Sequence, residues 1–490
     1  MNDILISKSK YISGLQCHKL LWHYYNAKNK IPSIDQATQA LFDQGHLVGE
    51  FAKQLYPEGL NVSKGVYAIP SVVRQTAEAV KHRRPLFEVG FIHKNAFARA
   101  DILNPVEKDR WDIIEVKSST ELKDENLHDL ALQRYVYEGA GLSIRNCHIM
   151  HINNEYVRHD DIDPNKLFKI VDVTGKVSEL IAHVEPNLRT MADVIKQKSP
   201  PEIQIGPYCE SPYLCPLYNV CWDYLPEHNV FTLYLFGKKG FDMLARGITE
   251  ILDMPDDVSL NDKQQIQLES LRTGIPHIDK AGIAAFLETL EYPLYFLDFE
   301  TFMTAIPLFD DVRPYQQIPF QFSLHILKSK NEKPGHHWFL SDGKSDPRPH
   351  ILNILYDKLG KSGSIIAYNA SFEKARLKES CETYTKYSKW YGEIEQRIVD
   401  LLYPFRSFYY YHSDQKGSAS IKVVLPVLTG TSYEGMDISE GGTASLEFLR
   451  VTFNKVDESE RIKVRKQLEE YCKLDTLGMI QIVEKLRELI

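Results

Sequence analysis

Long apolar runs are missing from this sequence. No stretch approaches the ~18–20 apolar residues that a membrane-spanning helix needs. The first residues, MNDILISKSKYIS, also lack the apolar segment of a secretory signal peptide. Cysteine is scarce, with 7 residues among 490, which excludes a disulfide scaffold. We therefore expect a cytoplasmic protein with reduced thiols and no membrane partner.

An excess of positive charge is missing too. The chain has 58 lysines and arginines against 66 aspartates and glutamates, so its net charge of −8 creates no overall basic field for nucleic acid. This disfavours a protein that coats nucleic acid without specificity. It does not disfavour a nuclease, whose carboxylates bind metal and whose phosphate contacts are local. A chain of 490 residues is too long for a single hydrophobic core, so we expect two or three domains.

Strand-like and helix-like patterns alternate along the chain, which predicts an α/β protein. Residues 1–228 predict a first domain, 229–288 a small helical connector, and 289–490 a second domain. In the first domain we expect strands at 87–92, 97–103, 111–117 and 145–152, and helices at 41–55, 127–141 and 165–197. In the second we expect strands at 294–302, 320–327, 336–340 and 364–369, and helices at 347–360, from Phe372 and from Glu458.

Two β-prone runs place functional side chains two residues apart. Glu115 and Lys117 lie in IIEVKSS, and Asp298 and Glu300 lie in LYFLDFETF. Because successive strand residues point to opposite faces, side chains two residues apart emerge on the same side. Ionised groups on a buried strand are costly unless a cation or another partner neutralises them. The pattern, present once in each half, indicates two hydrolytic metal centres.

In the first half, Asp101, Glu115 and Lys117 form a D…ExK pattern on two strands that we predict to be adjacent. Two carboxylates hold a divalent cation, Mg²⁺ or Mn²⁺, that polarises a phosphate and activates water. The lysine positions that water or stabilises the developing charge. An ExK pair by itself is more often a solvated pair on an edge strand.

Three further residues of the first half are candidates for the same centre. His46, on an upstream helix, is a candidate metal ligand. Gln133 and Tyr137 are four residues apart on a later helix and so share one face. This order of residues resembles the RecB-like branch of the PD-(D/E)xK nucleases. The resemblance covers about residues 7–224 and implies a restriction-endonuclease-like core, with catalytic roles for Lys117, Gln133 and Tyr137.

The opening SKSKYISGLQCHKLLW is similar to the start of the CRISPR-associated RecB-like exonucleases. Those relatives often carry a 4Fe-4S cluster on four cysteines. Cys17 matches the first of them, and Cys209, Cys215 and Cys221 in YCESPYLCPLYNVCW match the other three, although relatives usually have a more closely spaced pair. Zinc on the same four thiolates, or cysteines with no shared ligand, remain alternatives.

The second half contains three motifs in order. The first is Asp298 with Glu300, the second is Asn369 with Glu373 in YNASFEK, and the third is Tyr471 with Asp475 in YCKLDT. On a helix, the members of the third motif lie one turn apart on a single face. Four carboxylates hold two cations that stabilise the attacking and leaving oxygens together.

This trio resembles the exonuclease motifs of the DnaQ-like (DEDD) family, in the form with tyrosine in the third motif. The resemblance implies an RNase H-like fold, metal ligation by Asp298, Glu300, Glu373 and Asp475, and orientation of water by Tyr471. The second motif normally supplies aspartate, where this chain has glutamate. Asp400 is a further carboxylate for which capping of the following helix is the simpler role.

Together these patterns predict a protein with two nuclease centres. We expect Mg²⁺- or Mn²⁺-dependent hydrolysis of phosphodiester bonds in DNA, with a preference for single strands or ends. The resemblance implies 3′→5′ polarity for the second centre. An RNA-processing exonuclease on the same scaffold, and a nucleic-acid-binding adaptor with an inactive centre, remain alternatives.

Overall fold

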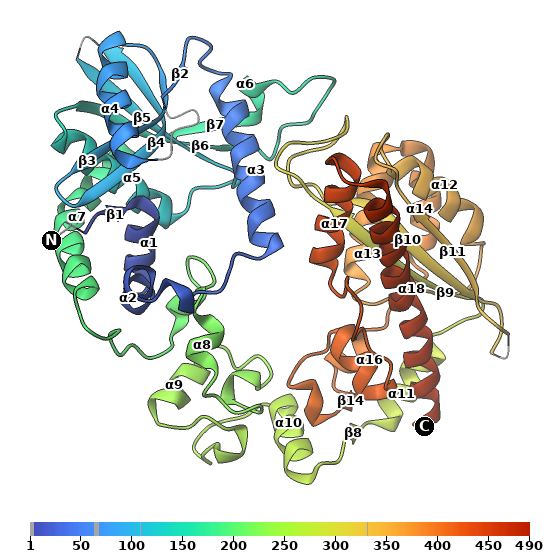
Figure 1. Cartoon of the computed structure of the whole chain (residues 1–490). Helices are drawn as coiled ribbons and strands as arrows, with labels where there is room; N and C mark the ends of the chain where they lie inside the picture. Colours follow the sequence, from blue (N-terminus) through green and yellow to red (C-terminus); the bar gives the residue numbers. More distant parts are fainter. Residues whose placement is uncertain (1–3, 63–67, 108, 331) are drawn as a thin grey trace. The chain divides into compact units, whose positions relative to one another are not determined.

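The structure is a computed structural model that describes residues 4–62, 68–107, 109–330 and 332–490. The chain divides into two compact units, and each mixes helices with a β-sheet, so the predicted α/β class is confirmed (Figure 1). The first unit is Met1–Tyr224 with Thr304–Tyr315, and the second is Leu225–Met303 with Gln316–Ile490.

The first unit is built around one mixed sheet. Its strands are β1 (Ile6–Ser7), β2 (Leu60–Asn61), β3 (Leu86–His93), β4 (Ala96–Glu107), β5 (Arg110–Lys117), β6 (Ser143–Ile152) and β7 (Phe168–Asp172). Among the described residues the order in space is β2-β3-β4-β5-β6-β7, with β1 paired to β4. The β3–β4 and β4–β5 pairs are antiparallel, whereas β5 and β6 are parallel. A parallel pair needs a crossover, which helix α5 (Asp124–Gly139) provides.

Helices cover both faces of this sheet. The principal ones are α1 (Lys8–Gln16), α2 (His18–Asn26), α3 (Gln36–Lys53), α4 (Ile69–Ala79), α5 and α7 (Thr174–Ile195). Neighbouring residues of β5 pack into different cores: Ile113 lies in the core that contains α5 residues, and Ile114 lies in the core that contains α3 residues. Glu115 and Lys117 follow Ile113 in steps of two and therefore point to the α5 face.

One predicted helix of the first unit is wrong. Residues 165–197 form a short helix α6 (Pro164–Leu167), then strand β7, and only then α7. β7 pairs antiparallel with β6 over Phe168–Asp172. The edge of β6 carries backbone groups that need partners, and the β-branched Ile170 and Val171 favour an extended chain there. The four predicted strands of this unit are confirmed by β3, β4, β5 and β6.

The second unit also has one central sheet. Its strands are β9 (Leu294–Phe302), β10 (Ile318–Leu327), β11 (Gly335–Leu340), β12 (Ile365–Ala367) and β13 (Ile398–Asp400). Within the described ranges they lie in the order β11-β10-β9-β12-β13. The first three are antiparallel, and β12 and β13 run parallel to β9.

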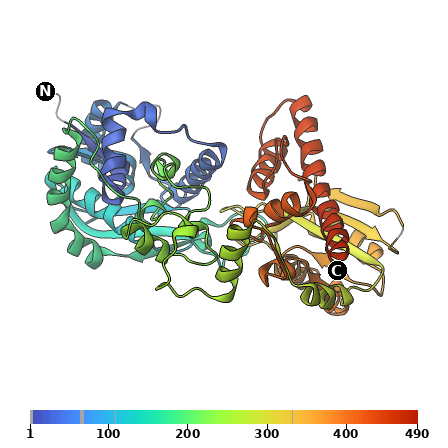
Figure 2. The ribbon, with the colours of Figure 1, turned by 90° about the horizontal axis from the view of Figure 1, so that it is seen from below.

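Two groups of helices cover this sheet. On one face lie α12 (Arg348–Lys358), α13 (Ser371–Thr383) and α14 (Ser388–Glu395), and on the other lie α17 (Gly441–Phe453) and α18 (Glu458–Glu488). Tyr295, Leu297 and Phe299 of β9 pack with the first group. The alternate residues Asp298 and Glu300 therefore face α18, which packs on β9 and β10 and leads to the C-terminus marked in both views (Figures 1 and 2).

The segment 229–288 belongs to the second unit. It contains α9 (Lys239–Ala245), α10 (Asp262–Thr273) and α11 (Lys280–Glu288), and a small core of its own. Its short strand β8 (His277–Ile278) pairs with β14 (Tyr410–Tyr411). In the part of the chain that the structure describes, no helix has the length and apolarity of a membrane span.

The aromatic packing beneath α17 gives a test of this arrangement. Phe448 is 1% exposed and stacks on Phe320 of β10, with 4.0 Å between ring centroids. We expect Phe448→Ala to lower the free energy of unfolding of the second unit by about 3–5 kcal/mol, measured by urea unfolding. Phe453→Ala, at a position that is 41% exposed in the same helix, should cost about 1 kcal/mol or less. Equal losses from both variants would contradict the packing.

Candidate active sites

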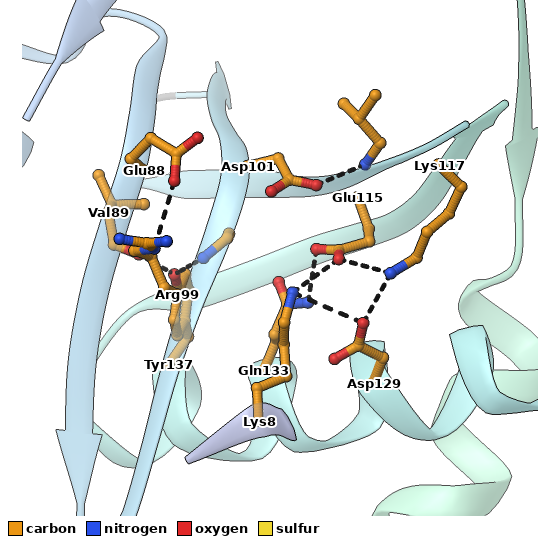
Figure 3. A network of polar contacts seen from close by, with 12 residues as sticks. Lys8, Glu88, Val89, Arg99, Asp101, Glu115, Lys117, Asp129, Gln133 and Tyr137 are labelled. Carbon is orange, nitrogen blue, oxygen red and sulfur yellow. Dashed lines mark hydrogen bonds and ion pairs between the residues drawn. The ribbon is translucent and has the colours of Figure 1, made fainter. Parts of the chain in front are cut away.

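In the first unit, Glu115 is the centre of a buried polar network (Figure 3). Its side chain is 2% exposed. The Oε1 atom accepts hydrogen bonds from the Nζ atoms of Lys8 at 2.6 Å and Lys117 at 2.8 Å. The Oε2 atom accepts a hydrogen bond from Gln133 Nε2 at 2.7 Å. The structure thus brings together Glu115, Lys117 and Gln133, as the sequence predicts.

Two members of this network were missed by sequence reasoning. Asp129 Oδ2 accepts a hydrogen bond from Lys117 Nζ at 2.8 Å and lies 3.5 Å from Lys8 Nζ. Asp129 precedes Gln133 by one helical turn of α5, so the shared helix face was a signal for it. Lys8 begins α1 and reaches the network only through the tertiary fold, so no local pattern indicates it.

Asp101 on β4 joins the network through a neighbouring strand. Its Oδ2 atom accepts a hydrogen bond from the backbone N–H of Val116 at 2.7 Å. Burial and the adjacent Glu115 carboxylate raise the pKa of Asp101 to about 7. Burial also acts against the charge of Glu115, but Lys117 and Lys8 hold the pKa of that carboxyl below its usual range. The two lysines therefore balance the negative charge of Glu115. At Asp101, burial and the repulsion from Glu115 outweigh the attraction of the same lysines.

Tyr137 lies on the same face of α5 as Gln133, but its hydroxyl group forms hydrogen bonds with the strands. Its hydroxyl donates to Val89 O at 2.7 Å and accepts from Ala100 N at 2.8 Å. These bonds tie β3 to β4 at a buried position. Tyr137 thereby supports the strand that carries Asp101.

His46 is not brought to the carboxylates. It is exposed on α3. That helix packs Val48 and Ala52 against Ile114, on the sheet face opposite Glu115. The helix was predicted from its pattern, but the choice of sheet face depends on tertiary packing.

The four predicted cysteine ligands of the first unit line one small cavity. Cys17 caps α1, Cys209 and Cys215 lie in the segment after α7, and Cys221 lies in the short helix α8 (Tyr218–Trp222) that follows. All of them are free thiols. Burial raises the pKa of Cys215 to about 11 and also raises that of Cys17. Within the described residues, no three of the sulfur atoms lie within 4.8 Å of one another.

In the second unit, Asp298 and Glu300 of β9 meet Asp475 of α18. Ligand oxygens of these three side chains all lie within 4.8 Å of one another. Burial and mutual repulsion raise the pKa of Glu300 to about 8 and that of Asp298 well above its usual range. Burial raises the pKa of Asp475 to about 6, although hydrogen bonds from tyrosines oppose the shift. One half-buried and two buried carboxyls at this separation form a site that a divalent cation can occupy.

Glu373, the fourth predicted ligand, lies near this group without joining it. It is 2% exposed in the first turn of α13, and its Oε2 atom has no hydrogen-bond partner among the described residues. Burial and the nearby Asp400 raise its pKa to about 8. Asp400 itself accepts from the N–H groups of Asn369 and Leu402, both at 3.0 Å. The following helix α15 (Tyr403–Arg406) has Leu402 as its N-cap and no side-chain cap, so Asp400 does not cap that helix as predicted.

Tyr433 and Cys472 are neighbours of the second centre that sequence reasoning missed. The Tyr433 hydroxyl donates to Asp475 Oδ1. Its ring centroid lies 6.0 Å from that of Tyr471, so two tyrosines flank Asp475. Cys472 Sγ lies 3.6 Å from Asp298 Oδ2. Tyr433 belongs to the loop between α16 (Ile421–Thr429) and α17, where no periodic pattern indicates an inward-facing residue.

The raised pKa values predict that cation binding to the second centre depends on pH. As pH rises from 6 to 8, Asp475 and then Glu300 lose their protons, so Mn²⁺ competes with fewer protons. We expect the Mn²⁺ affinity, measured by titration calorimetry on a Glu115→Gln protein, to rise by about tenfold per pH unit where one proton is displaced. Glu300→Gln should flatten this dependence. An affinity that stays constant between these pH values would contradict the assignment.

Comparison with known proteins gives distant relatives. A family profile described as "Domain of unknown function (DUF2779)" matches residues 295–420, from β9 to the loop before α16. "Uncharacterized protein MG366 homolog" of Mycoplasma pneumoniae is 26% identical over 239 residues, which are 43% of this chain and 36% of that protein. "Uncharacterized protein MG366" of Mycoplasma genitalium is 26% identical over 215 residues, 40% of this chain and 32% of that protein.

A third relative covers more of the chain. "Uncharacterized protein UU173" of Ureaplasma parvum is 25% identical over 362 residues, 65% of this chain and 49% of that protein. The matches thus span about a third to a half of the length of these relatives. None of the three names specifies a reaction.

Proposed function

We propose that the protein is a metal-dependent nuclease with two hydrolytic centres. The observation that carries this proposal is the meeting of Asp298 and Glu300 with Asp475, which the sequence places far apart, with all three ligand oxygens within 4.8 Å. Buried carboxyls that repel one another at this distance lack positive charge. A divalent cation supplies that charge, polarises a phosphodiester and activates water.

In the second unit we propose a DnaQ-like exonuclease on an RNase H-like fold, over residues 289–490. The strand order β11-β10-β9-β12-β13, with two strands parallel to β9, supports this. Asp298, Glu300 and Asp475 would hold the cation. Tyr471 lies on the same helix as Asp475, one turn away, where its hydroxyl can orient the attacking water. The water oxygen bonds to phosphorus, the bond from phosphorus to the 3′ oxygen breaks, and one water proton in effect moves to that oxygen.

In the first unit we propose a RecB-like PD-(D/E)xK nuclease, over residues 1–228, with 229–288 as a helical connector to the second domain. Three antiparallel strands, then α5, then the parallel β6 support this. Asp101 and Glu115 would hold one cation, because Asp101 lacks positive charge while Lys8 and Lys117 already compensate Glu115. Lys117 is then placed to stabilise charge that develops on the phosphate.

We also propose a 4Fe-4S cluster on Cys17, Cys209, Cys215 and Cys221. Their convergence on one cavity supports a shared ligand. A tetrahedral zinc with Zn–S bonds of ~2.3 Å would hold the sulfur atoms ~3.8 Å apart. Zinc on these four thiolates is the alternative, which the metal content of the protein separates from the cluster.

Cleavage assays test the two centres separately. End-labelled single- and double-stranded DNA and RNA are incubated with Mn²⁺ and the native protein, Lys117→Ala or Asp298→Asn. Each variant should lower one cleavage activity by about 100-fold or more while the other persists. Lys196→Ala and Asp193→Asn, at exposed positions, are the matched controls and should cleave normally. Unchanged cleavage by both Lys117→Ala and Asp298→Asn would contradict both centres, and faster cleavage of RNA would replace DNA as the substrate.

The cysteine proposal has its own test. Protein purified without oxygen should be brown, should contain iron and sulfide, and should lose both in Cys215→Ala. Cys381→Ala, a buried cysteine of the second unit, is the matched control and should keep the colour. A colourless protein with one zinc per chain would contradict the cluster.

A further inference from the structure

Lys422 lies beside the second centre, at the start of α16. Its Nζ atom is 5.0 Å from the ring centroid of Tyr471 and 5.7 Å from that of Tyr433. The same ammonium donates a hydrogen bond to the carbonyl oxygen of Ser439. Attraction between a cation and two aromatic faces holds this long side chain in one place.

The same two tyrosines connect Lys422 to the carboxyl group of α18. Tyr433 donates to Asp475 Oδ1, and Tyr471 lies one helical turn before Asp475. The charge of Lys422 lowers the pKa of both Glu300 and Asp475 against the raising effect of burial. Lys422 is therefore close enough to change the pKa values of the cation-binding carboxyls. Among the described residues it forms no ion pair with them, so it does not take the place of a bound cation.

The carboxyl groups of this centre suffice for one cation and fall short for two. Asp298, Glu300 and Asp475 form one compact set. Glu373 lies outside that set, and its buried Oε2 atom has no hydrogen-bond partner among the described residues. A second cation would need a further carboxyl, and the predicted fourth ligand, Glu373, is not in the set. The transition state of phosphodiester hydrolysis still needs compensation for the charge on the phosphate oxygens.

We propose that Lys422 binds a non-bridging oxygen of the substrate phosphodiester and supplies the positive charge that a second divalent cation would bring. The second centre then works with one cation held by three carboxyls and one ammonium held by two tyrosines. An ammonium has three N–H donors, so the bond to Ser439 leaves two for phosphate. This role rests on the proposed nuclease function of the second unit.

The test compares cleavage and cation binding between Lys422→Met and the protein with Lys422 intact. Both proteins also carry Glu115→Gln, which inactivates the first centre. Loss of a phosphate contact should lower kcat by about 100-fold. Loss of a positive charge beside Glu300 and Asp475 should at the same time tighten Mn²⁺ binding several-fold. Calorimetry should find one Mn²⁺ in the second centre with Lys422 intact. A purely structural role would weaken cleavage and Mn²⁺ binding together, and that result would overturn the proposal.

Two further variants keep the test decisive. Lys422→Arg retains the charge and should recover part of kcat, even if Lys422→Met unfolds. Lys416→Met, in the loop before α16 and paired with Glu227, is the matched control and should leave both readouts unchanged. Two Mn²⁺ ions in the second centre, or full kcat in Lys422→Met, would overturn the role of Lys422 while Asp298→Asn still abolishes cleavage. Absence of any cleavage that requires Asp298 would instead overturn the nuclease function, and this inference with it.

Discussion

Both centres depend on one constraint, the burial of like-charged carboxyls between a strand and a covering helix. A strand exposes alternate residues to one face, so Glu115 and Asp298 must point to the face that α5 or α18 covers. Each helix adds a further acid, Asp129 or Asp475. Charge of one sign in a buried layer is unfavourable unless cations balance it. The other features of each centre are ways of providing that balance.

The two units solve this problem differently. In the first unit the protein itself brings two ammonium groups, from Lys8 and Lys117, into direct contact with Glu115. In the second unit, among the described residues, the carboxyls receive hydrogen bonds from tyrosine and cysteine but no direct ion pair. The pKa values follow this difference: that of Glu115 is lowered, whereas that of Glu300 is raised. An added cation would therefore stabilise the charged carboxylates of the second centre more than those of the first.

The sequence predicted those parts of the centres that local periodicity determines. Strand alternation placed Asp298 with Glu300, and the four-residue helical repeat placed Gln133 on the face that meets Glu115. It did not predict partners that arrive through tertiary packing, such as Lys8 or Tyr433. His46 shows the same limit, because periodicity gives the buried stripe of a helix but not the sheet face that the stripe covers. The strand β7 was missed because its partner, the free edge of β6, is a property of the sheet.

The segment 407–422, SFYYYHSDQKGSASIK, illustrates how burial decides between two interpretations of one sequence pattern. Tyrosines beside Lys416 and Lys422 are compatible both with stacking on single-stranded bases and with covering a domain interface. Tyr410 and Tyr411 are buried, in the strand that pairs with β8, and Tyr411 stacks on Phe408. These rings are therefore unavailable for bases. Lys422, at the end of the same segment, is half-buried and lies near enough to Glu300 to lower the pKa of that carboxyl.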